Sequence, residues 1–147
     1  MKYKKLICVG CLCLSFALTG CYNKLEYDNY HKEVNVLYEK IVSTDAKINN
    51  IDVDSDESVQ DMFESLESLR VSFDDFANVE PPKEFQDCVF LSESASKYVS
   101  ISEDYFHKAL DGEYSDIDFK NGIANYNEVI KCVNYMGDVL QKKPQER

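Results

Sequence analysis

Apolar residues recur every three or four positions along most of this chain, which is the spacing that keeps one face of an α-helix apolar. Four such stretches follow one another, and none shows the strict alternation that is typical of a strand. The first two apolar faces consist of Tyr27, Tyr30, Val34, Leu37, Ile41, Thr44 and Ile48, and of Val59, Met62, Phe63, Leu66, Leu69, Phe73 and Phe76. The last two consist of Phe85, Cys88, Ser92, Ala95, Val99, Ser102, Phe106 and Ala109, and of Phe119, Ile123, Tyr126, Ile130, Val133, Gly137 and Leu140.

Polar turn residues separate the first helix from the second. Asn49-Asn50 ends the first helix. Asp54 or Ser55 can cap the second by accepting a hydrogen bond from its first turn, and Glu57 stands three residues after Asp54, as in a capping box.

Proline and glycine mark the remaining boundaries. Pro81 disfavours helix at the residue before it, so a break is expected there. The third helix is predicted to run from Lys83 to Asp111 with Gly112 as its C-terminal cap, and the last to begin near Ser115. Because short turns join long amphipathic helices, residues 26–141 are predicted to form an all-α, antiparallel up-down four-helix bundle, with residues 142–147 as a C-terminal tail.

A cationic start and a short apolar run open the chain. Lys2, Lys4 and Lys5 precede an uncharged run over residues 6–17, and the chain turns polar at Tyr22. This is the layout of a secretory signal peptide. The run is too short to remain as a transmembrane anchor, because a spanning helix needs about 20 apolar residues.

Leu18-Thr19-Gly20-Cys21 directly follows this run and has the form of a lipobox. In these residues the chain resembles the precursors of bacterial lipoproteins. The resemblance implies that a signal peptidase removes residues 1–20 and that a diacylglyceryl group with acyl chains such as palmitate is attached to the Cys21 sulfur. It also implies anchorage at the extracytoplasmic face of a cell membrane, with residues 21–25 as a lipidated N-terminus and short tether. Two acyl chains hold a protein stably at a bilayer.

The charge of the chain limits what it can bind. The net charge is −11, and removal of residues 1–20 takes away three lysines and no acidic residue. A domain this acidic is not expected to bind nucleic acid by neutralising phosphates. It is also repelled by anionic lipid surfaces, so the anchor is expected to hold the protein at the membrane.

The third apolar face is unusual because small residues occupy its middle, at Ser92, Ala95 and Val99. Small residues allow a neighbouring helix to approach closely, and this is the favoured interpretation, since protein cores are rarely underfilled. The other interpretation is a cavity between helices, lined by these three residues, that holds a small apolar ligand.

Two further groups of residues have the spacing of metal ligands. Asp52-Val53-Asp54-Ser55-Asp56 resembles the opening of an EF-hand loop, but Glu57 stands at the glycine position and Phe63 at the glutamate position. Helix capping explains these carboxylates better. Glu103, His107 and Asp111 share one helix face and could bind zinc, although charge pairing along the helix is favoured.

Cys88 and Cys132 are the two cysteines that follow Cys21. In a hairpin of the last two helices their axial offset is about 10 Å. A disulfide needs Cα atoms within about 7 Å, so free thiols are expected.

These observations favour a binding protein over an enzyme. The chain contains no nucleophile elbow, no zinc-protease motif and no phosphate-binding glycine loop. We therefore expect a non-enzymatic lipoprotein with no cofactor besides the lipid on Cys21, which binds a protein partner in the cell envelope. The alternative is a small-ligand or metal-binding lipoprotein that uses a cavity between helices. Tyrosine is enriched at interfaces, and the candidates for contact surface or core are Tyr98, Tyr105, Tyr114, Tyr126 and Tyr135.

Overall fold

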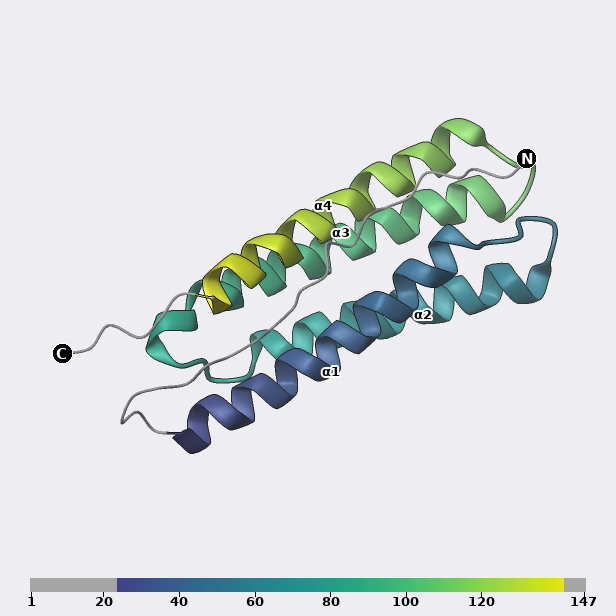
Figure 1. Cartoon of the computed structure of the whole chain (residues 1–147). Helices are drawn as coiled ribbons and strands as arrows, with labels where there is room; N and C mark the ends of the chain where they lie inside the picture. The colour runs from purple at the N-terminus through teal and green to yellow at the C-terminus, as the bar shows by residue number, and fades with distance from the viewer. Residues whose placement is uncertain (1–23, 142–147) are drawn as a thin grey trace.

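The computed structural model describes residues 24–141, and four long helices account for most of them (Figure 1). In chain order the elements are α1 (Lys24–Asn49), α2 (Asp56–Ala77), the short 3-10 helix η1 (Lys83–Phe85), α3 (Asp87–Leu110) and α4 (Asp116–Leu140). Residues 24–141 contain no strand. The predicted all-α four-helix fold is confirmed.

The helices run alternately up and down, so the bundle has two distinct ends (Figure 1). The loops of residues 50–55 and 111–115 lie at one end, which we call the tip. The start of α1, η1 and the end of α4 lie at the other end, which we call the base.

The four helices are not equally close to one another. Each helix packs beside its neighbour in the sequence, and α3 lies between α2 and α4. In contrast, no Cα atom of α1 lies within 8 Å of a Cα atom of α4 or of α3. Helix α1 is therefore attached to the bundle mainly through α2, and it faces α4 across a wider seam.

The predicted apolar faces form the core of the bundle. Their members are buried except for Val59 and Ile123, which are half-buried and pack against the core. The structure adds four residues of the second half of α4 that the periodicity does not include, namely Val129, Cys132, Met136 and Val139. They are buried because this half of α4 contacts both α3 and η1, so more than one face is covered.

Serine side chains begin two of the helices. The Ser55 hydroxyl accepts a hydrogen bond from the Ser58 N–H, and the Ser115 hydroxyl accepts one from the Asp118 N–H. Each bond satisfies an amide that has no partner within its own helix. Of the two caps considered for α2, Ser55 is the one used.

Two predicted details of the third helix are wrong. Residues Lys83–Phe85 form a separate 3-10 turn, in which Phe85 N–H donates to the Pro82 carbonyl, and α3 begins at Asp87. The Phe85 ring is directed to α1, where it lies 5.6 Å from the ring of Tyr27. Gly112 is not a left-handed cap, since no residue in 24–141 has a positive φ.

The end of α3 is closed in another way. The Asp111 N–H donates to the His107 carbonyl, and the Ser115 N–H donates to the Ala109 carbonyl. These bonds satisfy the last carbonyls without the backbone conformation that favours glycine.

Helices α3 and α4 pack closely against each other at Gly122. A Cβ atom placed on Gly122 of α4 would lie 2.7 Å from ring carbons of Phe106, which is fully buried on α3. The hydroxyl of Ser102 on α3 donates a 2.8 Å hydrogen bond to the Gly122 carbonyl. Because Gly122 has no side chain, α3 and α4 can approach each other this closely.

We predict that Gly122→Ala lowers the free energy of unfolding by about 1 to 3 kcal/mol, because the added methyl group overpacks the contact with Phe106. Urea denaturation followed by circular dichroism measures the change. Gly112→Ala is the matched control, since a Cβ at that position meets nothing within 4 Å. Equal stability of the two variants would contradict the proposed role of Gly122.

Candidate functional site

The small residues of α3 lie inside the bundle. Ser92, Ala95 and Val99 are fully buried. The Ser92 hydroxyl donates a 2.7 Å hydrogen bond to the carbonyl of Phe73 on α2, as the Ser102 hydroxyl does to α4. Such bonds satisfy the buried hydroxyls and bring the backbones together, which is the geometry expected from close packing.

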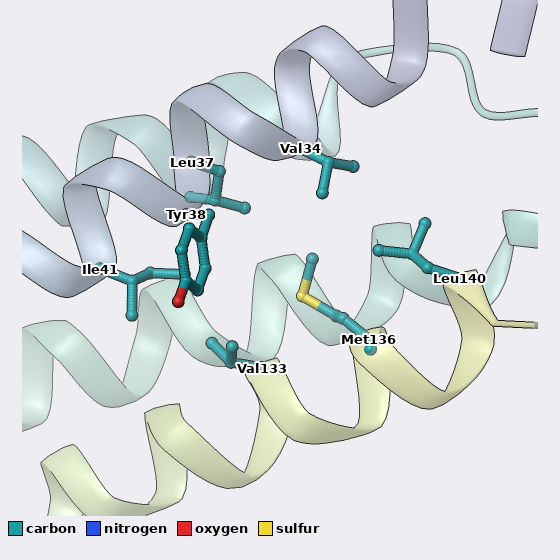
Figure 2. Close-up of a pocket in the computed structure, with 8 residues that line it drawn as sticks. Val34, Leu37, Tyr38, Ile41, Val133, Met136 and Leu140 are labelled. Atoms are coloured by element: carbon teal, nitrogen blue, oxygen red, sulfur yellow. The ribbon is translucent and has the colours of Figure 1, made fainter. Parts of the chain in front are cut away.

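A groove lies elsewhere, along the seam between α1 and α4 (Figure 2). Figure 2 shows side chains of α1 facing side chains of α4 across it. The lining residues are Val34, Leu37, Tyr38, Ile41, Val133, Met136, Gly137 and Leu140. Its volume is about 30 Å³, which is about the space of one water molecule, whereas ligand pockets measure about 300 to 1,000 Å³. This groove is therefore a loosely filled apolar seam and too small for an organic ligand.

Two polar groups are buried beside the same seam. Asp45 of α1 is 8% exposed, and its Oδ1 has no hydrogen-bond partner among residues 24–141. Tyr126 of α4 is fully buried, and its hydroxyl likewise has no partner in that range. Burial raises the pKa of the Asp45 carboxyl, and a hydrogen bond from Asn49 partly offsets this. Burial and the nearby Asp45 also raise the pKa of the Tyr126 hydroxyl.

The residues of α3 that were predicted as possible zinc ligands make contacts of another kind. His107 Nδ1 lies 2.9 Å from the nearer Asp111 carboxylate oxygen, and the His107 ring stacks on Phe63 with the centroids 3.9 Å apart. Glu103 on the same face is half-buried, and burial raises its pKa. In the described part of the chain, no three His, Cys, Asp or Glu residues are grouped so that they could hold a metal ion.

The aspartates before α2 take part in the turn that starts this helix. Asp52 Oδ1 accepts a 3.1 Å hydrogen bond from the Asp54 N–H, and the Asp52 N–H donates to the Ser58 hydroxyl. Together with the Ser55 cap, these bonds hold the loop against the first turn of α2.

Cys88 on α3 and Cys132 on α4 are buried free thiols. Burial raises the pKa of the Cys132 thiol, which keeps it protonated. Protonated thiols are poor nucleophiles, so this residue has the character of a packed core side chain.

The tip exposes apolar side chains next to carboxylates. Ile117 is 74% exposed, and Tyr114 and Val53 are also exposed. Residues 50–57 and 111–118 together contain eight acidic residues and no Lys or Arg. We call Val53, Tyr114 and Ile117 the tip surface. Ile117 does not belong to the apolar periodicity of α4, but its place between Asp116 and Asp118, off the buried face, marks it as an apolar residue among polar ones.

The five tyrosines predicted to form contact surface or core differ in how far they are exposed. Tyr114 and Tyr135 are exposed, whereas Tyr126 is part of the core. Tyr98 is partly buried against the core, and Tyr105 is half-buried and lies under the Lys108 ammonium group.

The lipobox residues Leu18, Thr19, Gly20 and Cys21 lie outside the described residues. Among the helices of residues 24–141, none is both long enough and apolar enough to span a membrane. Comparison with protein-family models, curated proteins and solved structures gives no match. The function is therefore argued from the residues of this chain alone.

We predict that Asp45→Asn stabilises the protein at pH 7, because burial raises the pKa of the Asp45 carboxyl and the ionised form is poorly solvated there. The folded pKa of Asp45 lies above its ordinary value, so the folded state binds the proton more tightly than the unfolded chain does. The free energy of unfolding should consequently fall as pH rises from the ordinary to the raised pKa, and stay lower above it.

Urea denaturation from pH 3 to pH 8 measures this dependence, which the Asp45→Asn variant should reduce. Asp104→Asn, which changes an exposed residue of α3, is the control. Destabilisation by Asp45→Asn at pH 7 would show that the ionised carboxylate has a stabilising partner.

Proposed function

We propose that this protein is a membrane-anchored, extracytoplasmic bacterial lipoprotein without enzymatic activity, and that its helical bundle binds a protein partner in the cell envelope. The lipobox at residues 18–21 supports the anchor, with a diacylglyceryl group on Cys21 as the membrane-binding element. The exposed apolar side chains that lie beside carboxylates at the tip support the binding function.

The observation that carries the proposal is that the tip lies at the opposite end of the bundle from the start of α1, the helix that follows the proposed anchor. Helix α1 begins at Lys24, three residues after Cys21, so the base of the bundle is held near the membrane. Helix α4 has 25 residues and is therefore about 38 Å long. The tip surface lies at the end of the bundle opposite to the start of α1 (Figure 1). We propose that it faces away from the membrane, where a partner can reach it.

The chemistry of the tip indicates what kind of partner fits. Exposed Ile117 and Tyr114 supply apolar and aromatic contact area, which is typical of the centre of an interface. The surrounding carboxylates favour a partner that presents Lys or Arg, because opposite charges speed encounter and set orientation. We therefore propose a basic protein surface as the partner.

The alternative function, binding of a small ligand or a metal, has no observation in its favour among residues 24–141. Ser92 of the predicted cavity bonds directly to α2, and the groove between α1 and α4 measures only about 30 Å³. Partner binding at the tip agrees better with the residues that are exposed.

We predict that Cys21→Ser moves the protein from the membrane fraction to the soluble fraction, because the variant cannot be acylated and the acidic bundle has little affinity for anionic lipid. Fractionation and immunoblotting measure the distribution. Cys13→Ser, in the apolar run of the signal, is the control and should remain with the membrane. Membrane retention of Cys21→Ser would exclude Cys21 lipidation as the anchor.

We predict that Ile117→Asp abolishes the recovery of a crosslinked partner from membranes, because it places a charge in the centre of the tip surface. Ile117 is 74% exposed, so the variant should fold normally. Val71→Asp is the control, since Val71 is 43% exposed on α2 and lies away from the tip. Unchanged recovery with Ile117→Asp, or no enrichment of any partner by the unmodified protein, would contradict this function.

A further inference from the structure

The seam between α1 and α4 is weakly packed along its length. No Cα atom of α1 lies within 8 Å of a Cα atom of α4, and the apolar groove between the two helices is incompletely filled. Figure 2 shows Val34 and Leu140 at one end of this groove and Ile41 and Val133 at the other. Atoms that are separated by a gap lose much of their van der Waals attraction, so this groove contributes little to holding α1 on α4.

A polar pair continues the same seam toward the tip. Asp45 follows Ile41 by four residues, which is about one helical turn, and its charge acts on the hydroxyl of Tyr126 on α4. Neither Asp45 Oδ1 nor the Tyr126 hydroxyl has a hydrogen-bond partner among residues 24–141. Both groups are poorly solvated while the seam is closed, and opening of the seam gives them water as a partner.

Helix α1 is held more firmly on α2. The Thr44 hydroxyl donates a 3.2 Å hydrogen bond to the Ser65 carbonyl. The Lys47 ammonium group donates a 3.3 Å hydrogen bond to the Asp61 carbonyl and lies 3.8 Å from a carboxylate oxygen of the same residue. Cα atoms of the two helices also approach within 8 Å of each other. Helix α1 can therefore rotate on α2, away from α4, while it keeps these contacts.

A second set of contacts fastens the first turns of α1 at the base. The Tyr27 hydroxyl donates a 2.6 Å hydrogen bond to the Glu84 carboxylate, and the Tyr30 ring stacks on Phe85 with the centroids 5.9 Å apart. We call these four residues the catch. They join α1 to η1, the short helix that precedes α3, so they must separate before the seam can open fully.

We propose that α1 is a strap that rotates on α2 away from α4, that the catch holds it closed, and that the buried Asp45 carboxylate favours its release. Opening hydrates Asp45 and Tyr126 and exposes the apolar side chains of the groove. Helices α2, α3 and α4 keep their close packing in this state, because local openings of a protein need less free energy than global unfolding. The inference depends neither on the proposed lipidation nor on the proposed partner.

A thiol in the groove can measure how often the seam opens. Val34 lines the groove and is 6% exposed, so Val34→Cys places a small buried thiol there. Cys132 of α4 is also buried but does not line the groove, and it serves as the internal reference. The purified full chain is treated with N-ethylmaleimide under native conditions. Digestion with trypsin and mass spectrometry then measure the two sites separately, because several lysines lie between them.

The expected result is that the Val34→Cys thiol reacts about tenfold faster than Cys132, which corresponds to a difference of about 1.4 kcal/mol in the free energy of opening. Global unfolding exposes both thiols, so the ratio of the two rates reports the opening of the seam. Equal rates would overturn the proposal. Ile41→Cys, at the other end of the groove, repeats the measurement if urea denaturation shows that Val34→Cys is unstable.

A thiol on the side of α1 that faces α2 tests the axis of the rotation. Thr44→Cys should react as slowly as Cys132, because α1 remains on α2 while the seam opens. Fast reaction of Thr44→Cys as well as Val34→Cys would show that α1 detaches completely, which would contradict a rotation on α2.

Two substitutions in the Val34→Cys chain should change the ratio of rates in opposite directions. Asp45→Asn removes the buried charge and should lower the ratio severalfold. Tyr27→Phe removes the hydrogen bond to Glu84 and should raise the ratio severalfold. Asp104→Asn, which changes an exposed residue of α3, is the control and should leave the ratio unchanged. A ratio that is insensitive to Asp45→Asn and Tyr27→Phe would exclude the roles assigned to Asp45 and to the catch.

Discussion

The distances from α3 to its two neighbouring helices are set by three residues. Two of them are serines of α3 that donate hydrogen bonds to neighbouring helices, and the third is a glycine of α4. Ser92 bonds to a carbonyl of α2, Ser102 bonds to a carbonyl of α4, and Gly122 leaves room for the Phe106 ring. These contacts make α3 the central helix, with a close neighbour on each side. The other features of the fold follow from this arrangement, because the helix that does not touch α3 closely, α1, is left at the outside.

Helix α1 lies at the outside of the bundle. This position explains why an incompletely filled groove and buried oxygens without hydrogen-bond partners occur side by side between α1 and α4. Its seam with α4 is apolar and incompletely filled, and the unpartnered oxygens of Asp45 and Tyr126 are buried beside it. A buried carboxylate costs stability at neutral pH, since charge is poorly solvated there. The same helix follows Cys21 most closely, so any force on the proposed anchor acts first on the least firmly attached helix of the bundle.

The up-down topology also separates two kinds of surface. Both loops with dense carboxylates lie at the tip, whereas the start of α1 and the turn around η1 lie at the base. The proposed lipid anchor at one end and the charged, partly apolar surface at the other would suit a protein that presents a binding surface at a distance from a membrane. In that proposal, the length of the helices contributes most of the distance.

The helical periodicity alone determined the number of helices, nearly all of the core and the serine start of α4, because amphipathic faces and caps depend on residues only a few positions apart. The interpretation as a lipoprotein depends on residues 1–21, and it remains a prediction because these residues lie outside the described part of the chain. Tertiary structure decided that four more residues of α4 are buried and that Lys83–Phe85 form a separate 3-10 turn. It also decided that α3 ends without a left-handed glycine at position 112. It also decided that Oδ1 of Asp45 is buried without a hydrogen-bond partner while Phe90 and Ile117 are exposed. Those outcomes depend on which helix covers which face, and that is fixed by contacts between residues far apart in the sequence.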